Sequence, residues 1–405
     1  MDGLLFLAHR IPFPPNKGDK IRSFHLLQHL SRRYQIHLGA FVDDPDDWQY
    51  QDALKPYCAS IKLLPLKGRR AKLASLAGLW TGEALTLPYY RNRELKAWAQ
   101  DLAASGQVTR GLAFSSAMGQ FMPDTLARRV LDMVDVDSDK WTQYAPTQRW
   151  PLSWVYAREG RKLAEWEAQM ADAFDATLLV SCAEAALLQQ RVPRVRHKIG
   201  AFENGVDAGY FSPTQDYANP YAPDLRHIVF TGAMDYWPNI DAVTWFAKQI
   251  FSAVRDAVPT AHFTIVGSRP GEAVTELTRL PGVSVTGSVP DVRPFLAHAD
   301  CAVAPLRIAR GVQNKVLEAM AMARPVVVSP QAAEGLRAEA GRDYTLAQGE
   351  AAFAEAVVAQ LQNPSDASAG RHCIERYYDW SRNLVAIDPL FEPDTAVSPV
   401  LERIC

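Results

Sequence analysis

The chain has 405 residues, of which 48% are hydrophobic and 22% are charged, and its formal net charge is -2. This length exceeds what a single hydrophobic core usually organises, so two domains are expected. The composition disfavours extended disorder, and the near-neutral charge disfavours a nucleic-acid-binding protein. The five cysteines are dispersed and form no CxxC pair, which favours reduced thiols and gives no zinc spacing.

The N-terminal apolar run, residues 4–8, is short and has no basic flank, so it does not read as a signal peptide. No run of about 18 apolar residues predicts a membrane-spanning helix. We therefore expect a cytoplasmic protein. Two cationic stretches that lie near tryptophans, 67–72 and 91–98, leave open a peripheral contact with the inner membrane, although a solvated helix face explains them equally simply.

The first half of the chain alternates short apolar runs with amphipathic segments. A helix is predicted over 19–33, because Ile21, Phe24, Leu27 and Leu30 recur at helical spacing. Strands are predicted at 4–8, 36–42, 61–64, 111–114, 130–134 and 177–180.

The same rhythm restarts near residue 226, after a joint at 200–225 that is rich in Pro, Asn, Gly and Tyr. This alternation predicts a parallel sheet covered by helices on both faces. The tail after Glu392 lacks periodicity and is expected on the surface. Strands are predicted at 228–230, 262–266, 283–286, 302–304 and 326–328, and helices at 241–254, 271–280, 291–298 and 314–322.

Neither familiar nucleotide fingerprint is present. The chain has no GxxxxGK[ST], which disfavours a P-loop ATPase, and no GxGxxG after its first strand, which disfavours an NAD enzyme of the usual kind. Ligands of parallel sheets nevertheless bind at the carboxyl ends of the strands, so the loops after each strand are the places to search.

The loop after the first strand is rich in proline and ends at Gly18, just before a predicted helix that continues with Asp19 and Lys20. Glycine lets a ligand approach the backbone, and a helix N-terminus offers free N–H groups to an anion. A rigid turn with Asp19 as the helix cap explains the same residues.

An acidic loop with Asp135, Asp137 and Asp139 follows the strand at 130–134, and Lys140 and Trp141 come next. An EF-hand is excluded, because its sixth and twelfth positions would need Gly and Glu. Two readings stay open here: acids that cap a helix, and acids that face the substrate, directly or through a metal.

The stretch after the strand at 302–304 gives the most information about a ligand site. Gly311 precedes a predicted helix, and the cations Arg310 and Lys315 stand close by. A helix N-terminus with cations suits a diphosphate, and Glu318, about one turn farther on, can accept hydrogen bonds from ribose hydroxyls. A solvated basic loop is the alternative.

In their order and spacing these segments resemble the retaining glycosyltransferases of family four, which have the GT-B fold. The resemblance implies two Rossmann-like domains that face each other across a cleft: an acceptor domain at 1–203, a donor domain at 204–370, and a C-terminal helix within 371–405 that returns to the first domain. Its carriers are the Gly18 loop, Asn-Gly-Val-Asp at 204–207 with Phe211, the strands near 265–267 and 285–287, and Leu-Glu-Ala-Met-Ala at 317–321 followed by 325–327.

A closer resemblance is to sugar transferases associated with exosortase and exopolysaccharide loci, which implies a role in making an extracellular polysaccharide. Its carriers are 12–15 with 18–22, 134–141, 232–236 with Pro238 and Asn239, and 311–315.

The chain also departs from the broad family. Of the family's two glutamates, the second matches Glu318, whereas Arg310 occupies the place of the first. Ala233 and Pro238 or Asn239 stand where the family has a cation pair. We therefore predict that Arg310 and Lys315 supply the positive charge.

The resemblance implies transfer of a sugar from a nucleoside diphosphate sugar to a glycan or lipid-linked acceptor, without a metal or other cofactor and without nucleic acid as a partner. A sugar-nucleotide epimerase of the same fold, or a non-catalytic nucleotide-sugar-binding partner of a transferase, are the alternatives. The predicted catalytic residues are Arg310, Lys315, Asp135 and Asp137. The predicted donor-binding residues are Gly18, Asp19, Lys20, Gly232, Arg310, Gly311, Asn314, Lys315 and Glu318.

Overall fold

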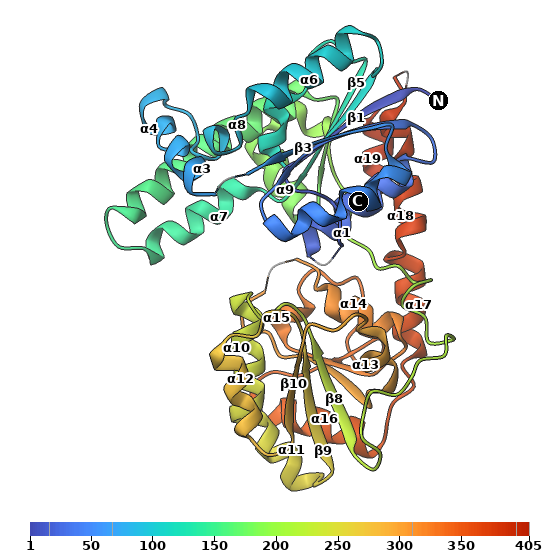
Figure 1. The fold of residues 1–405 in the computed structure, drawn as a ribbon. Helices are drawn as coiled ribbons and strands as arrows, with labels where there is room; N and C mark the ends of the chain where they lie inside the picture. The colour runs from blue at the N-terminus through green and yellow to red at the C-terminus, as the bar shows by residue number, and fades with distance from the viewer. Residues whose placement is uncertain (16, 67, 310, 394, 405) are drawn as a thin grey trace. The chain divides into compact units, whose positions relative to one another are not determined.

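A computed structural model describes residues 1–15, 17–66, 68–309, 311–393 and 395–404. The chain divides into two compact units. The first comprises Met1–Glu203 with Asn383–Cys405, and the second comprises Asn204–Arg382. Each unit is built around its own parallel sheet (Figure 1).

In the first unit, seven strands within the described residues form a parallel sheet in the order β3-β2-β1-β4-β5-β6-β7. The strands predicted from the sequence are confirmed, with ends that differ by one or two residues. The last strand was not predicted, because three residues give no periodicity. The strands are β1 (Gly3–Ala8), β2 (Gln35–Val42), β3 (Ser60–Pro65), β4 (Arg110–Phe114), β5 (Arg128–Val134), β6 (Ala176–Leu179) and β7 (Ile199–Ala201).

Helices cover both faces of this sheet. On one face, residues of α6, α8 and α9 share a single apolar core with Leu5 and Leu7 of β1. The predicted helix α1 lies on the other face, where Arg22 meets Asp132 of β5. The helices are α1 (Gly18–Leu30), α2 (Gln51–Leu54), α3 (Gly68–Ser75), α4 (Ala77–Thr81), α5 (Thr86–Tyr90), α6 (Arg93–Ala104), α7 (Asp137–Tyr144), α8 (Leu152–Ala173) and α9 (Cys182–Arg191), with 3-10 turns η1 (Pro45–Tyr50), η2 (Lys55–Tyr57), η3 (Ser116–Phe121), η4 (Ala145–Thr147) and η5 (Pro193–Lys198).

From Asn383 the C-terminal segment belongs to the first unit, and it comprises the rest of α18 (Trp380–Ile387), η8 (Asp388–Phe391) and α19 (Ser398–Ile404). Arg110 Nε donates to the Phe391 carbonyl at 2.8 Å. The expectation of a surface tail after Glu392 is wrong, because α19 buries Leu401 against β7. Gly200 makes room for it: a Cβ there would lie 2.8 Å from the Leu401 side chain.

In the second unit, six strands within the described residues form a parallel sheet in the order β10-β9-β8-β11-β12-β13. Figure 1 shows α10, α11 and α12 on one side of it and α13, α14 and α17 on the other. The strands are β8 (Arg226–Thr231), β9 (Ala261–Val266), β10 (Val283–Gly287), β11 (Cys301–Ala304), β12 (Val326–Val328) and β13 (Thr345–Leu346). The helices are α10 (Trp237–Trp245), α11 (Phe251–Ala257), α12 (Glu272–Thr275), α13 (Arg293–His298), α14 (Asn314–Ala321), α15 (Pro330–Ala333), α16 (Glu350–Gln362) and α17 (Ser368–Tyr377), with a π turn η6 (Phe246–Ile250) and a 3-10 turn η7 (Glu276–Arg279).

Two predicted helices of this unit differ from their expected form. The helix expected over 271–280 is divided into α12 and the 3-10 turn η7. The helix expected over 241–254 begins at Trp237, contains the π turn η6 and ends with α11. Pro238 lies in the first turn, where the missing N–H has no intrahelical partner to lose, so a proline is compatible with a helix start there.

In each sheet the strand order reverses beside the first strand: between β1 and β4 in one unit, and between β8 and β11 in the other. Loops that leave two such strands run in opposite directions, which leaves a crevice at the carboxyl ends for a ligand. These two places are where the candidate residues are sought.

The most buried charges of the first unit generate a stability prediction. Arg22 and Asp132 are both 0% exposed and meet through two hydrogen bonds of 2.7 and 3.1 Å. Arg22→Met leaves the buried Asp132 carboxylate without its cation. It should lower the free energy of unfolding by about 3 kcal/mol or more, measured by urea denaturation.

The double variant Arg22→Met/Asp132→Leu is the control. Since it removes both charges together, it should regain most of that loss. A single variant as stable as the parent would show that the pair does not stabilise this unit.

Candidate active site

The loops at the strand reversal of the second unit approach each other through their backbones. The loop after β8 begins at Gly232, whose N–H donates to the Val266 carbonyl at 3.0 Å, and Met234 N–H donates to the Ser268 carbonyl at 2.8 Å. A Cβ at Gly267 would lie 1.8 Å from the Gly232 oxygen. Only glycine at 267 permits this approach, and it fixes the position of the 232–236 loop.

A side-chain bond joins the helices that follow β8 and β11. Lys315 Nζ, near the start of α14, donates to Asn239 Oδ1 of α10 at 2.9 Å. Asn239 is 5% exposed, and its Nδ2 donates to the Ala233 carbonyl at 2.9 Å. The ammonium also lies 5.1 Å from the centre of the Phe230 ring. Lys315 is therefore held at the reversal point by residues from the β8 side.

Sequence reasoning missed Asn239 as a site residue. In the sequence it supported the closer resemblance and marked a position where the broad family has a cation. The asparagine carbonyl instead positions a cation supplied by the neighbouring helix, and this could not be found without the strand order.

Lys315 and Glu318 lie one turn apart on α14, and burial changes the pKa of both. Burial lowers the pKa of Lys315 to about 8, although the charge of Glu318 opposes this shift. Burial raises the pKa of Glu318 to about 7, and Lys315 opposes that shift. Burial therefore disfavours the charged form of each side chain. A ligand that brings an opposite charge or a hydrogen-bond partner would favour that charged form.

The start of α14 offers a further unmatched polar atom. Asn314 Oδ1 is buried and has no hydrogen-bond partner among the described residues. Gly311 just before it has φ of +62°, a left-handed conformation that favours glycine. The structure thus brings Gly232, Asn314, Lys315 and Glu318 to one region, whereas Arg310 lies outside the described residues.

This arrangement suits a nucleoside diphosphate chemically. An ammonium beside a helix N-terminus attracts phosphate oxygens. The Asn314 carbonyl oxygen and the Glu318 carboxylate can accept hydrogen bonds from sugar hydroxyls.

In the first unit, the loop after β1 carries an ion cluster. Asp19 accepts hydrogen bonds from Arg10 Nη1 at 2.8 Å, and His9 Nε2 lies 3.3 Å away. Burial alone would raise the pKa of Asp19, but the His9 hydrogen bond and the charges of His9 and Arg10 bring it well below its usual range. Lys17 occupies the cap position of α1, so Asp19 does not cap the helix.

The other two predicted residues of this loop differ in accessibility. Gly18 opens α1 and is exposed, and a Cβ there would meet nothing within 4 Å. Lys20 is 2% exposed, and its ammonium is 2.6 Å from Asp47 Oδ2. That charge is already engaged inside the unit, so we leave Lys20 out of the proposed donor contacts.

His9 is a residue that sequence reasoning did not single out. It follows β1 directly, and its ring stacks on Phe114, the last residue of β4, with centroids 5.8 Å apart. Its Nδ1 is buried without a hydrogen-bond partner in the described part of the chain. A histidine at the end of a predicted strand was the signal that could have identified it.

In the acidic loop, Lys140 pairs with the carboxylates of Asp135 and Asp137. Lys140 Nζ lies 2.7 Å from Asp135 Oδ2 and 3.1 Å from Asp137 Oδ1. Burial would lower the pKa of Lys140, but the charges of Asp137 and Asp135 outweigh it and raise that pKa. Asp137 and Asp139 stand in the first turn of α7, where acids stabilise the helix dipole.

Two features are absent from the described residues. No three or more His, Cys, Asp or Glu side chains are grouped as metal ligands would be. None of the helices combines the length and the apolar character needed to cross a bilayer.

Comparison with known proteins places these features in a class. Residues 226–363 match the family described as Glycosyl transferases group 1. The structure of sucrose-phosphate synthase from Thermosynechococcus elongatus is similar, with a TM-score of 0.69 at 18% identity over 96% of this chain and 98% of that chain. No curated protein sequence matches.

Two further structures are similar over nearly the full length. HepE of Anabaena in complex with UDP and glucose gives a TM-score of 0.61 at 14% identity, over 95% of this chain and 97% of that chain. WaaG, a glycosyltransferase involved in lipopolysaccharide biosynthesis, gives 0.63 at 13% identity, over 96% and 100%. At these identities the likeness establishes the fold.

The fold is therefore GT-B, as predicted from the sequence. The group 1 match covers most of the second unit, so that unit is a glycosyltransferase domain of the group 1 type. The predicted enzyme class is confirmed, and no observation favours the epimerase alternative.

The backbone approach at Gly267 generates a prediction about the donor loop. Gly267→Ala places a Cβ against the Gly232 carbonyl, which cannot move without shifting the 232–236 loop. We expect a loss of about 2 kcal/mol or more in the free energy of unfolding, measured by urea denaturation.

Gly271→Ala is the matched control, because a Cβ there meets nothing within 4 Å and the backbone φ is -76°. It should change stability by less than about 0.5 kcal/mol. Equal effects of the two substitutions would contradict the importance of this contact.

Proposed function

We propose that the protein transfers a sugar from a nucleoside diphosphate sugar to a glycan or lipid-linked acceptor in the synthesis of an extracellular polysaccharide. The observation that supports this most is the cluster of Lys315, Asn314 and Glu318 at the strand reversal of the group 1 domain.

In this proposal Lys315 contacts the donor diphosphate. Its ammonium, positioned by Asn239, stabilises the negative charge that grows on the leaving phosphate, and the start of α14 adds its dipole. Glu318 and Asn314 accept hydrogen bonds from the ribose hydroxyls. Gly232 and Gly311 let the backbone approach the nucleotide, and Arg310 is proposed as a second cation. HepE has been solved with UDP and with UDP-glucose, which supports a uridine donor among the candidates.

The first unit is proposed to supply the acceptor side. Gly18 and the backbone N–H of Asp19 would contact the donor phosphate, since the Asp19 carboxylate is engaged by Arg10 and His9. Asp135 or Asp137 would orient the hydroxyl that attacks the sugar. The Lys140 salt bridges hold those two carboxylates in place. The similarity to WaaG, described as acting in lipopolysaccharide biosynthesis, and the resemblance to exopolysaccharide transferases both support a cell-surface glycan as product.

A thermal-shift and transfer assay tests the proposal. One of UDP, GDP, ADP or CMP, or its sugar conjugate, should stabilise the protein, by about 2.7 kcal/mol at 100 times its dissociation constant. Lys315→Met and Glu318→Gln should lose most of this shift, whereas Lys248→Met should keep it, since Lys248 is exposed.

Nucleotide binding should also depend on pH. Above its pKa of about 8, Lys315 is mostly neutral in the free protein, and a bound diphosphate favours its charged form. Binding should therefore take up protons above about pH 8, and affinity should fall as pH rises, measured by calorimetry in two buffers of different ionisation enthalpy. Lys315→Met should abolish the uptake.

Other outcomes would change the assignment. Nucleotide binding without transfer to any acceptor would favour the non-catalytic partner, and conversion of the donor without an acceptor would favour the epimerase. Absence of any nucleotide shift would contradict the transferase proposal.

We also propose a peripheral contact with an anionic membrane, through exposed apolar side chains of the first unit. Trp80 is 92% exposed, Trp150 82% and Leu73 70%. Arg158 Nη2 of α8 donates to the Gly78 carbonyl at 2.6 Å, which holds α4 against α8. Lys72 on α3 is exposed and suits an anionic surface. Figure 1 shows α3 and α4 together at one corner of this unit.

The two cationic stretches noted in the sequence differ in their surroundings. Lys67 lies outside the described residues, and the remainder of 67–72 falls in α3, beside the exposed apolar side chains. In the stretch 91–98, Leu95 is fully buried and Trp98 packs against the core, so this stretch is a helix with one face in the protein.

Vesicle sedimentation tests the membrane contact. The full chain should sediment with phosphatidylglycerol vesicles at low salt, and Trp80→Ser/Trp150→Ser should weaken binding by about tenfold or more. Trp237→Ser is the control, since Trp237 is exposed in the second unit. No sedimentation of the parent chain, or equal binding by all variants, would refute the contact.

A further inference from the structure

An open groove of about 580 Å³ lies along the outer face of α10 in the second unit. Its wall is formed by side chains of α10 and of the segment after it, joined by one residue from the loop after β11, one from α12 and one from α16. The lining residues are Trp237, Ile240, Asp241, Thr244, Trp245, Lys248, Gln249, Ala273, Arg307 and Glu350.

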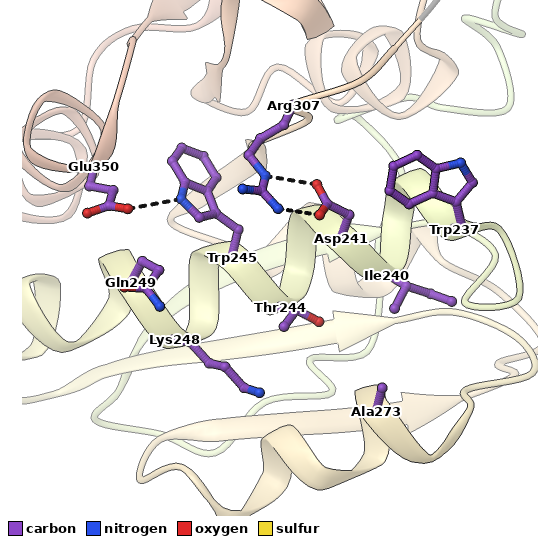
Figure 2. A pocket seen from close by; sticks show the side chains of 10 residues that line it. All are labelled: Trp237, Ile240, Asp241, Thr244, Trp245, Lys248, Gln249, Ala273, Arg307 and Glu350. Carbon is purple, nitrogen blue, oxygen red and sulfur yellow. Dashed lines mark hydrogen bonds and ion pairs between the residues drawn. The ribbon is translucent and has the colours of Figure 1, made fainter. Parts of the chain in front are cut away.

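Two indole rings mark the length of the groove. Trp237 and Trp245 stand on the same side of α10, two turns apart, which corresponds to about 12 Å along the axis (Figure 2). Trp237 is 56% exposed. An indole face held open to water suits the apolar C–H face of a sugar ring.

A planar ion pair lies between the two indoles. Arg307 Nε donates to Asp241 Oδ2 at 2.9 Å, and a second bond joins its Nη2 to Oδ1 (Figure 2). The Arg307 side chain is 51% exposed and its guanidinium lies 5.7 Å from the centre of the Trp245 ring. With five N–H donors, a guanidinium in this pair keeps donors for hydroxyl groups of a ligand.

Other polar groups also face the groove. Trp245 Nε1 donates to Glu350 Oε1 at 3.2 Å, which fixes the ring (Figure 2). Thr244 Oγ1 is buried and has no hydrogen-bond partner among the described residues. A buried hydroxyl that lacks a partner costs stability, so a ligand hydroxyl at this position would be favourable.

The charges of the lining balance. Asp241 and Glu350 oppose Lys248 and Arg307, so the groove offers no net attraction to a phosphate. Aromatic faces combined with paired polar groups of both signs suit a neutral polyhydroxyl ligand. The open form of the groove suits one or two residues of a longer chain better than an enclosed small molecule.

We propose that this groove is a second carbohydrate site, which binds neutral sugar residues of a glycan through Trp237, Arg307 and Thr244. It is separate from the proposed donor site, because Asn239, which holds Lys315, is buried on the inner side of the same helix. The inference goes beyond the proposed transfer reaction and does not require it.

A purely structural role of the Arg307–Asp241 pair must be distinguished from sugar binding. The pair fastens the loop after β11 to α10, so its loss could disturb the start of α14. Trp237 is the better probe, because its side chain is 56% exposed.

Saturation-transfer NMR on the full chain tests the proposal, with maltotriose, cellotriose, mannotriose and chitotriose as probes and with UDP present in excess. At least one trisaccharide should receive saturation on its ring protons, and UDP should not displace it. Trp237→Ala should weaken that binding by about tenfold, equivalent to about 1.4 kcal/mol. Trp154→Ala, which removes an exposed tryptophan of the first unit, should leave it unchanged.

Thr244→Val is the second variant, because it keeps the side-chain shape and removes the hydroxyl. It should also weaken binding, while circular dichroism and the Tm confirm folding of every variant. Lack of saturation on all four probes, displacement by UDP, or equal binding by parent and Trp237→Ala would each overturn the second site. The nucleotide assay is separate, so failure of the donor proposal would be recognised independently.

Discussion

The hydrogen bond from Lys315 to Asn239 connects two chain segments that leave neighbouring strands in opposite directions. Without it, the partly buried Lys315 ammonium would have only an aromatic face and a nearby carboxylate to offset its desolvation. The backbone contact between Gly267 and Gly232 places the β8 loop so that the Ala233 carbonyl can orient the asparagine. The charge of the site therefore depends on a chain of contacts that begins in the sheet.

Much of the architecture could be predicted because parallel strands buried on both faces are continuous apolar runs, as in 4–8 and 326–328. The short strands β7 and β13 could not, since their place is set by a neighbouring strand. The burial of α19 also escaped prediction, because it depends on space that Gly200 leaves in a remote part of the chain.

In the candidate site, too, some residues could be predicted from the sequence and others could not. Lys315 and Glu318 were predictable, since they follow a strand and start a helix. Asn239 was not, because its pairing requires the order of the strands. Lys20 looked available in the sequence, but Asp47, 27 residues away, engages it. Spacing identifies which residues could act, whereas long-range ion pairs decide which charges stay accessible.

The π turn at Phe246–Ile250 has a consequence for the shape of this domain. Residues five apart on an α-helix differ by about 140° in angular phase, yet Phe246 and Phe251 both contact Phe263, with ring centroids 4.6 and 5.9 Å apart. The wider turn restores their alignment. Both rings therefore stay on the aromatic core, whereas Trp237 and Asp241 on the preceding α10 line the groove on its outer face.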